Sequence, residues 1–303
     1  MFKCILCQKE GEGIVTKYKP RDKKMLNVID CPFCGHRQLW PLLSDEELQE
    51  EYNSDKTVKE MLKTDQNDEV GFEAMRVKFS EWTRVHGEMY WPILQNAKRV
   101  LNIGSGYGFL EEYYNEKSDK RFEIIGNEIG KYRLDHFVGG EVCTINFAVE
   151  EIPDDMLGSF DVILGLHILE HLNNPVEYLM RIKPLLRKGG KLYIEVPNLN
   201  SFLCELSKEY DEFFYLYEHV SYFTEKTLSL VFEKAGYKNI KTYTKEIYSV
   251  ENHINWIRTG KPFTKYNQMF LPDERIEFIN SEYKDVIGKM GKGYALICEA
   301  EVG

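Results

Sequence analysis

Four of the seven cysteines form two C-x-x-C pairs near the N-terminus, Cys4 with Cys7 and Cys31 with Cys34. Two such pairs can direct four thiolates at one tetrahedral zinc ion, and a closed four-thiolate site leaves no open position for catalysis. The residues between the pairs are rich in lysine and poor in apolar side chains, so this segment needs a metal to become ordered. The spacing predicts a structural zinc ribbon over residues 1–40, with His36 as a bystander. The alternative is a set of ordinary reduced cysteines.

A second chemical signal is the stretch VLNIGSGYGFLEE, in which an apolar run precedes Gly104, Ser105, Gly106 and Gly108. Glycines in this position allow a tight turn and a close approach of a ligand to backbone N–H groups at the start of the next helix. The following apolar run ends in GNE, and Glu128 lies there, about 20 residues after the loop, where a carboxylate can accept both hydroxyls of a ribose. The pattern predicts a cofactor cradle. A solvated acidic residue at a strand end is the other interpretation of Glu128.

A third signal is the stretch DEFFYLYEHVSYFTEKTL, which is crowded with aromatic and ionisable side chains. Glu218 lies beside His219, and Tyr217 and Tyr222 flank them. Such neighbours can tune an imidazole for proton abstraction near neutral pH. The alternative is an aromatic surface helix with a structural histidine.

The elements that must position these residues follow from the hydrophobic pattern. Residues 44–94 have a helical pattern, with Ser44 and Glu47 as a capping box and a second helix over residues 70–89. From residue 98 onward, helical stretches alternate with the apolar runs RVLNIG, FEIIGNE, FDVILGLH and KLYIEVPN, which predicts a parallel α/β sheet. Two later runs, YKNIKTYTKE and GYALICEAEV, predict a terminal pair of strands.

These patterns divide the chain into a zinc ribbon (1–40), a helical linker that covers the cofactor site (41–97) and an α/β domain (98–303) with an insertion at about 248–290. Within the insertion, Trp256 and Arg258 could contact a ring and a phosphate of a nucleotide-linked acceptor. An amphipathic helix that caps the sheet is the alternative.

Composition limits the classes of partner. The chain has 303 residues, of which 43% are hydrophobic, and a formal net charge of −10, so it can bury a large core and repels a polyanionic partner. Nucleic acid is therefore an unfavourable substrate. The absence of an apolar run of about 20 residues and of a signal-peptide pattern predicts a cytoplasmic protein without a membrane span, and an oligomer remains open.

From Lys98 onward the sequence resembles the class I S-adenosylmethionine-dependent methyltransferases. VLNIGSGYG resembles their first motif, with Asn102 where an acidic residue is usual, and IIGNE resembles the ribose motif that ends in Glu128. FAVEEIP resembles the segment that borders the adenine, which implies contact with the backbone of Ala148 and Val149. The resemblance implies a Rossmann-like sheet with helices on both faces and S-adenosylmethionine as cofactor.

The stretches FDVILGLHILEHLNNP and LLRKGGKLYIEVPN resemble the subgroup of this family that acts on small molecules. The resemblance places His167 after a strand and facing the cofactor cleft, either as a wall of the cofactor pocket or as a substrate contact. We expect Glu170 and His171 to be mainly structural, ordering the loop after the strand.

Tyr217, Glu218, His219 and the following YFT resemble a cluster that lies over the sugar in zinc-containing sugar methyltransferases, which also carry an N-terminal two-knuckle zinc module. The resemblance implies His219 as general base, with Glu218 and Tyr222 beside it. Carbon-methylating members have a further C-terminal domain that this chain does not contain. We therefore expect oxygen methylation of a small acceptor, such as a nucleotide-linked sugar or a related capsule or antibiotic precursor.

Three alternatives stay open at this point: carbon methylation of a ketosugar, methylation of RNA with the help of the zinc module, and a protein that binds the cofactor without catalysis. Residues 1–40 carry eight Lys/Arg and four Asp/Glu, and a zinc held by four thiolates adds a charge of about −2. The remaining positive charge is a weak anchor for phosphates.

Overall fold

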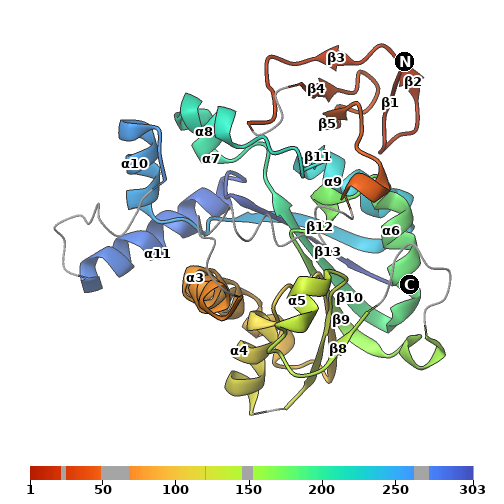
Figure 1. Ribbon diagram of the computed structural model, residues 1–303, viewed down its shortest axis with the longest axis vertical. Helices are drawn as coiled ribbons and strands as arrows, with labels where there is room; N and C mark the ends of the chain where they lie inside the picture. The colour runs from red at the N-terminus through yellow and green to blue at the C-terminus, as the bar shows by residue number, and fades with distance from the viewer. Residues whose placement is uncertain (22–24, 49–67, 120, 145–152, 263–272, 303) are drawn as a thin grey trace. The chain divides into compact units, whose positions relative to one another are not determined.

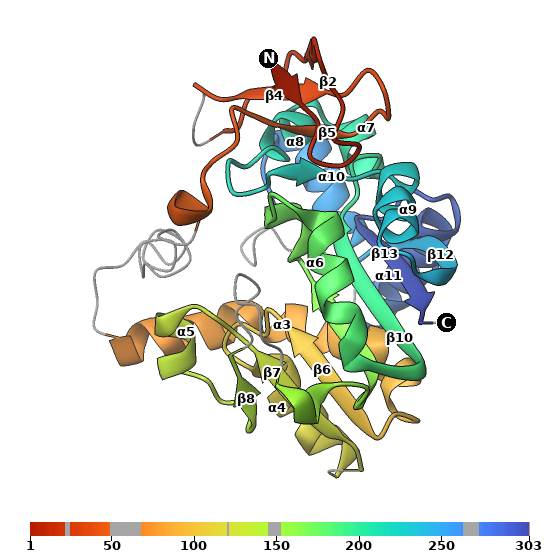
Figure 2. The ribbon, with the colours of Figure 1, turned by 90° about the vertical axis from the view of Figure 1, so that its right-hand side faces the viewer.

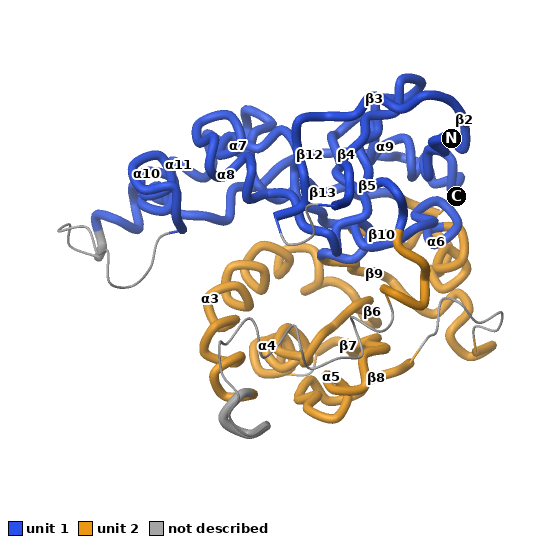
Figure 3. The backbone as a smooth tube through the Cα atoms, turned by 45° about the horizontal axis from the view of Figure 1, so that its top comes forward, with its two compact units in different colours: residues 1–42, 167–179, 194–300 blue, residues 43–166, 180–193, 301–303 orange. Residues whose placement is uncertain are grey.

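In the computed structural model the chain divides into two compact units (Figure 3). Unit 1 contains residues 1–42, 167–179 and 194–300, and unit 2 contains residues 43–166, 180–193 and 301–303. The structure describes residues 1–21, 25–48, 68–119, 121–144, 153–262 and 273–302. Within these residues, no helix is both long enough and apolar enough to cross a membrane.

Unit 2 contains the glycine-rich segment and the strands around it (Figures 1 and 2). Its elements are α3 (Asp68–Leu94), β6 (Arg99–Ile103), α4 (Phe109–Ser118), β7 (Glu123–Asn127), α5 (Lys131–Asp135), β8 (Val142–Cys143), the 3-10 turns η1 (Asp154–Met156) and η3 (Lys183–Leu185), and β9 (Phe160–Leu166). Strand β6 pairs in parallel with both β7 and β9, and β7 pairs in parallel with β8. The parallel arrangement predicted for these strands is confirmed.

The register brings three strand ends to one edge of the sheet. Ile103, the last residue of β6, is opposite Asn127 of β7 and Gly165 of β9. The glycine loop follows β6, Glu128 follows β7, and His167 follows β9 by one residue beyond Leu166. In open parallel sheets this carboxyl edge is where ligands bind, because the loops there are free to carry functional groups.

The long helix α3 packs against α4 and extends the predicted helix by a few residues at each end. Its buried face includes Tyr90 and Leu94, and Met75 packs against Tyr107 of the glycine loop. A short helix begins after Ser44, where the Glu47 side chain accepts from the Ser44 N–H at 2.8 Å and Ser44 Oγ accepts from the Glu47 N–H at 3.1 Å. The predicted capping box is therefore confirmed.

Unit 1 combines the N-terminal ribbon with the C-terminal part of the chain. Its elements are β1 (Phe2–Lys3), β2 (Glu10–Gly11), β3 (Ile14–Val15), β4 (Asn27–Asp30), β5 (Arg37–Trp40), η2 (Leu169–His171), α7 (Phe202–Leu206), α8 (Lys208–Phe213), β11 (Ser221–Tyr222), α9 (Glu225–Lys234), β12 (Lys238–Lys245), α10 (Val250–Thr259), α11 (Asp273–Lys289) and most of β13 (Ala295–Glu301). Helix α6 (Pro175–Ile182) and strand β10 (Leu186–Pro197) each have residues in both units.

The seven-stranded sheet has the order β12-β13-β10-β9-β6-β7-β8. The two terminal strands predicted from the sequence, β12 and β13, are neighbours in this order. This mixed α/β architecture with a mostly parallel sheet confirms the predicted Rossmann-like fold class.

The ribbon forms a second, antiparallel sheet that includes a strand from far along the chain. Its order is β11-β5-β4-β3, and β11 pairs with β5 through Ser221 opposite Gln38 and Tyr222 opposite Arg37. Residues 1–42 therefore share one compact unit with residues 194–300.

The insertion contributes α10 and α11 to unit 1. Trp256 is 3% exposed, and its ring centroid lies 5.0 Å from those of both Tyr210 and Phe213. The ring of Trp256 therefore packs inside unit 1, and contact of Trp256 or Arg258 with an acceptor stays a prediction.

Candidate active site and metal centre

The glycine loop closes back onto strand β7. The N–H groups of Gly104 and Ser105 both donate to the Asn127 carbonyl oxygen, at 2.8 and 3.0 Å. Gly104, Gly106 and Gly108 have φ values of 70°, 61° and 77°, a left-handed conformation that glycine adopts without the strain of a Cβ atom. The sequence pattern thus corresponds to a true tight turn between β6 and α4.

Two of these glycines serve different purposes. A Cβ atom on Gly108 would lie 2.6 Å from the backbone nitrogen of Gly139, so Gly108 permits close packing inside the protein. A Cβ atom on Gly106 would have no atom within 4 Å. Packing therefore explains Gly108, whereas Gly106 borders open space that a ligand could fill.

Glu128 is buried at 4% exposure, and its carboxylate holds the loop in place. Oε2 accepts from the Gly106 N–H at 2.9 Å, and Oε1 accepts from the N–H groups of Ile129 and Gly130 at 2.8 and 2.7 Å. A carboxylate offers about four acceptor positions, so Oε2 keeps capacity for a ligand hydroxyl. Burial excludes the alternative of a solvated acidic residue at a strand end.

A buried pair beneath the loop was not predicted. Asn102 of β6 donates through Nδ2 to Oε1 of Glu111 on α4 at 2.6 Å, and both side chains are buried. Burial raises the pKa of Glu111 to about 7. Glu111 of helix α4 thus places a carboxyl group beside Asn102. Asn102 occupies the position at which the family that the sequence resembles usually has an acidic residue. The signal in the sequence was the acidic pair that follows the third glycine.

In unit 1, His167 lies between two buried carboxylates. Its Nδ1 is 3.2 Å from Oε1 of Glu170 and its Nε2 is 3.2 Å from Oε1 of Glu195, and its backbone N–H donates to the Glu195 carbonyl oxygen at 2.9 Å. Burial alone would lower the pKa of His167, but the two carboxylates outweigh it and raise the pKa to about 10. His167 is thus a fixed imidazolium at neutral pH. Glu195 was missed because a single glutamate in the apolar run KLYIEVPN gave no spacing signal.

The three predicted catalytic residues lie in the segment before and within β11. His219 faces His171, with ring centroids 4.9 Å apart, and burial together with His171 lowers the pKa of His219 to about 3. The Glu218 backbone oxygen is 2.9 Å from His171 Nδ1. The hydroxyl of Tyr222 donates to the Leu216 carbonyl oxygen at 2.7 Å. The catalytic roles of His219, Glu218 and Tyr222 stay predictions.

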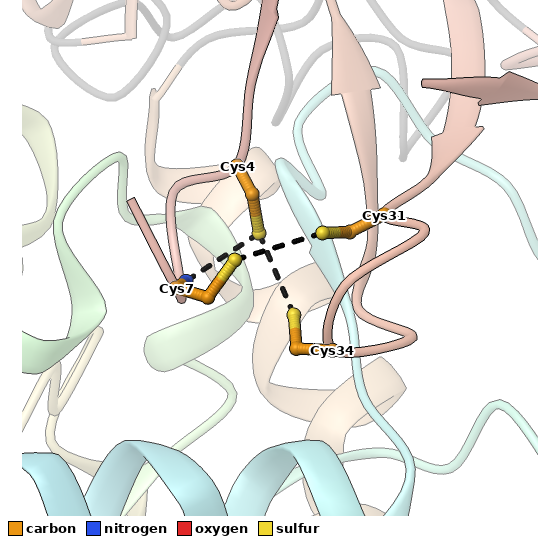
Figure 4. Close-up of side chains that lie close together, drawn as sticks. All are labelled: Cys4, Cys7, Cys31 and Cys34. Carbon is orange, nitrogen blue, oxygen red and sulfur yellow. Dashed lines mark hydrogen bonds between the residues drawn. The ribbon is translucent and has the colours of Figure 1, made fainter. Parts of the chain in front are cut away.

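The four paired cysteines converge in the ribbon (Figure 4). The Sγ atoms of Cys4 and Cys34 are 3.7 Å apart, and those of Cys7 and Cys31 are 3.6 Å apart. Zn–S bonds of about 2.3 Å in a tetrahedron place sulfur atoms about 3.8 Å apart, and these two distances match that spacing.

The bystander His36 lies outside this cluster, because its Nε2 is 3.2 Å from Ser221 Oγ of β11. The predicted adenine contacts, Ala148 and Val149, lie outside the described residues.

Comparison with known proteins identifies the family. A family model described as a methyltransferase domain matches residues 76–242. The ubiquinone biosynthesis O-methyltransferase of Nitrosococcus oceani is 33% identical over 108 residues, which cover 34% of this chain and 44% of that protein. The (S)-coclaurine N-methyltransferase of Thalictrum flavum is 24% identical over 212 residues, which cover 65% of this chain and 53% of that protein. The chain spans about half the length of these relatives.

The fold has a counterpart among solved structures. A SAM-dependent methyltransferase from Archaeoglobus fulgidus has a TM-score of 0.50 at 20% identity, with 76% of this chain and 99% of that chain covered. The family match extends over strands β6 to β11, the glycine loop and Glu128. The chain belongs to the methyltransferase-domain family and has the fold of a class I S-adenosylmethionine-dependent methyltransferase.

Proposed function

We propose that this protein transfers the methyl group of S-adenosylmethionine to an oxygen atom of a small polar acceptor, with a nucleotide-linked sugar as the favoured class. The observation that carries the cofactor part is the open space at Gly106, at the carboxyl edge of three parallel strands and beside Glu128. The left-handed φ of 61° explains why the residue is glycine, and the space beside it is open at the edge of the sheet where ligands bind.

The cofactor supplies an electrophilic methyl group on a sulfonium sulfur. On the protein side, Gly106 gives it room, the remaining acceptor capacity of Glu128 suits the ribose hydroxyls, and the Asn102–Glu111 pair lies under the loop. In-line displacement requires that the acceptor be aligned with the methyl group, and these residues position the cofactor for it.

The acceptor class rests on the resemblance of Tyr217, Glu218, His219 and the following YFT to the sugar-binding cluster of zinc-containing sugar methyltransferases. The names of the relatives include an oxygen and a nitrogen methyltransferase, so they leave the methylated atom open. The negative net charge disfavours RNA as the acceptor.

The ribbon has a structural task in this proposal. A zinc ion on the four cysteines would fix β4 and β5, and β5 pairs with β11, which begins two residues after His219. The hydrogen bonds from Tyr18 to Asp211 at 2.5 Å and from Arg37 to Tyr215 at 2.6 Å anchor the preceding residues to the same ribbon. Zinc would thus hold the segment that carries the predicted base.

His219 is the side chain that we propose to act on the acceptor proton. We expect His219→Ala to lower turnover by about 100-fold or more, which is the usual contribution of general acid–base catalysis. Affinity for S-adenosylhomocysteine should stay unchanged, because the cofactor loop is in the other compact unit. His136→Ala is the matched control, since His136 is a half-buried histidine of unit 2. Wild-type turnover in His219→Ala would exclude the role.

The decisive experiment is mass spectrometry of reactions that contain methyl-deuterated S-adenosylmethionine, a panel of nucleotide-activated hydroxyl and keto sugars, and total RNA. A labelled sugar whose fragments carry the label on oxygen supports the proposal. Label on carbon would replace it by carbon methylation, and label in RNA would replace the acceptor class. Cofactor binding without any labelled product would identify a non-catalytic binding protein.

A further inference from the structure

We propose that Glu170, His171 and His219 form a binding site for a divalent transition-metal cation, separate from the four cysteines. Each residue offers one ligand atom, and the three atoms lie within 4.8 Å of one another. All three belong to unit 1, where η2 supplies Glu170 and His171 and the segment before β11 supplies His219. The sequence favoured a structural role for the first two, because it could not bring His219 to them across 47 residues.

The distances suit a small cation. Three atoms no more than 4.8 Å apart have a common centre within about 2.8 Å of each, compared with metal–ligand bonds of about 2.0–2.2 Å to nitrogen and oxygen. Movement of each ligand atom toward that centre by about 0.6–0.8 Å would therefore close the site.

The hydrogen bond made by His171 prepares its other nitrogen for a metal. Its Nδ1 lies 2.9 Å from the Glu218 carbonyl oxygen, which can only accept, so Nδ1 carries the proton. Its Nε2 is 3.9 Å from Oε1 of Glu170. A bond from the second ring nitrogen to a carbonyl is also the usual arrangement around metal-bound histidine.

Glu170 provides the second, independent observation. Its side chain is 1% exposed, and among the described residues its Oε2 has no hydrogen-bond partner. A buried carboxylate oxygen left in this state is costly, because it has lost its hydration without gaining a donor. Oε1 already interacts with His167, whose other nitrogen reaches Glu195. These contacts from Glu195 through His167 orient the carboxylate of Glu170, and they leave its Oε2 to bind a cation.

The donor set selects the kind of cation. Two imidazole nitrogens and one carboxylate oxygen suit Mn²⁺, Fe²⁺, Co²⁺ or Zn²⁺, whereas Mg²⁺ prefers oxygen ligands alone. Three protein ligands leave positions open for water or an acceptor. The His171 side chain is 14% exposed.

The role of the cation deepens the proposed oxygen methylation and rests on it. An acceptor hydroxyl bound at an open position would lose its proton to solvent more readily, because the cation stabilises the alkoxide. The oxygen lone pair then forms the bond to the methyl carbon, the carbon–sulfur bond breaks, and its electron pair stays on sulfur, which leaves as the neutral thioether. This scheme replaces the general-base role of His219 by that of a cation ligand, and weaker Mn²⁺ binding in His219→Asn would decide in favour of the ligand.

The test is a titration of the full-length protein with Mn²⁺, followed by the electron paramagnetic resonance signal of free Mn²⁺, without cofactor or acceptor. Mn²⁺ is a poor partner for thiolates, so the cysteine cluster does not compete. We expect about one Mn²⁺ per chain, with at least about tenfold weaker binding in Glu170→Gln and in His219→Asn. His136→Asn is the matched control, since its Nδ1 also lies 2.9 Å from a backbone carbonyl oxygen, that of Tyr132.

A second measurement on the wild-type protein covers the case in which Glu170→Gln does not fold. Electron spin-echo modulation of bound Mn²⁺ should contain couplings to histidine nitrogen. Absence of these couplings, or equal affinity in wild-type and His219→Asn, would overturn the site. The Mn²⁺ measurements involve no methyl transfer. A negative result in them would therefore overturn the cation site and leave the outcome of the labelled-acceptor experiment independent. Full turnover after chelation has removed the cation would overturn the catalytic role.

Discussion

The buried pair under the cofactor loop gives a prediction about pH and stability. Burial raises the pKa of Glu111 from 4.5 to about 7, so the folded protein retains a proton that the unfolded chain releases above about pH 4.5. The stabilisation that protonated Glu111 contributes is complete at low pH, and it decreases as the pH rises toward 7. Linkage gives a loss of roughly 2–3 kcal/mol in the free energy of unfolding between pH 5 and pH 8.

Glu111→Gln should abolish this loss, because glutamine cannot ionise and its Oε1 can still accept from Asn102. The assay is urea unfolding by tryptophan fluorescence at pH 5 and pH 8 in the same salt, for wild type, Glu111→Gln and the neighbouring control Glu112→Gln. Glu112 pairs with Arg76 at the surface at 2.7 Å, and its side chain is 30% exposed. We expect the control to follow wild type. An equal loss of stability in wild type and Glu111→Gln would refute the reasoning.

Three further predictions concern the cradle, the ribbon and the insertion. Gly106→Val should weaken calorimetric binding of S-adenosylhomocysteine by at least about tenfold, while Gly158→Val, which has the same φ of 61° and equally open space, should not. Cys4→Ser should lower the zinc content, measured by plasma mass spectrometry, by about one atom per chain, and Cys298→Ser should leave it unchanged. Trp256→Ala should lower the free energy of unfolding by about 3–5 kcal/mol in urea, because it removes a fully packed ring.

The sequence predicted the parts of the fold that are determined by residues close together in the chain. Strands β6, β7 and β9 are buried on both faces, so their apolar runs are continuous and can be recognised one at a time. The tight turn of the glycine loop needs left-handed residues, and glycine marks them directly. The C-x-x-C pairs are likewise short-range, since each knuckle is built by four consecutive residues.

The contacts that the sequence could not predict join distant segments. Pairing of β5 with β11 brings Gln38 to Ser221, and no periodicity in either segment indicates the other. The same holds for Glu195, which meets His167 only because the chain returns through β10. Two-residue strands such as β11 carry too few side chains for a recognisable alternation.

The position of Glu170 illustrates why a buried charge needs the whole structure to be interpreted. From the sequence, a glutamate and a histidine after a strand are adequately explained by ordering of a loop. In the folded chain, His167 accounts for only one of the two oxygens of Glu170, and among the described residues Oε2 has no hydrogen-bond partner. Loop ordering explains the contact with His167 and leaves Oε2 unexplained. A cation on Glu170, His171 and His219 accounts for Oε2, and it also links the ribbon to the site, because the strand that the ribbon binds begins two residues after His219.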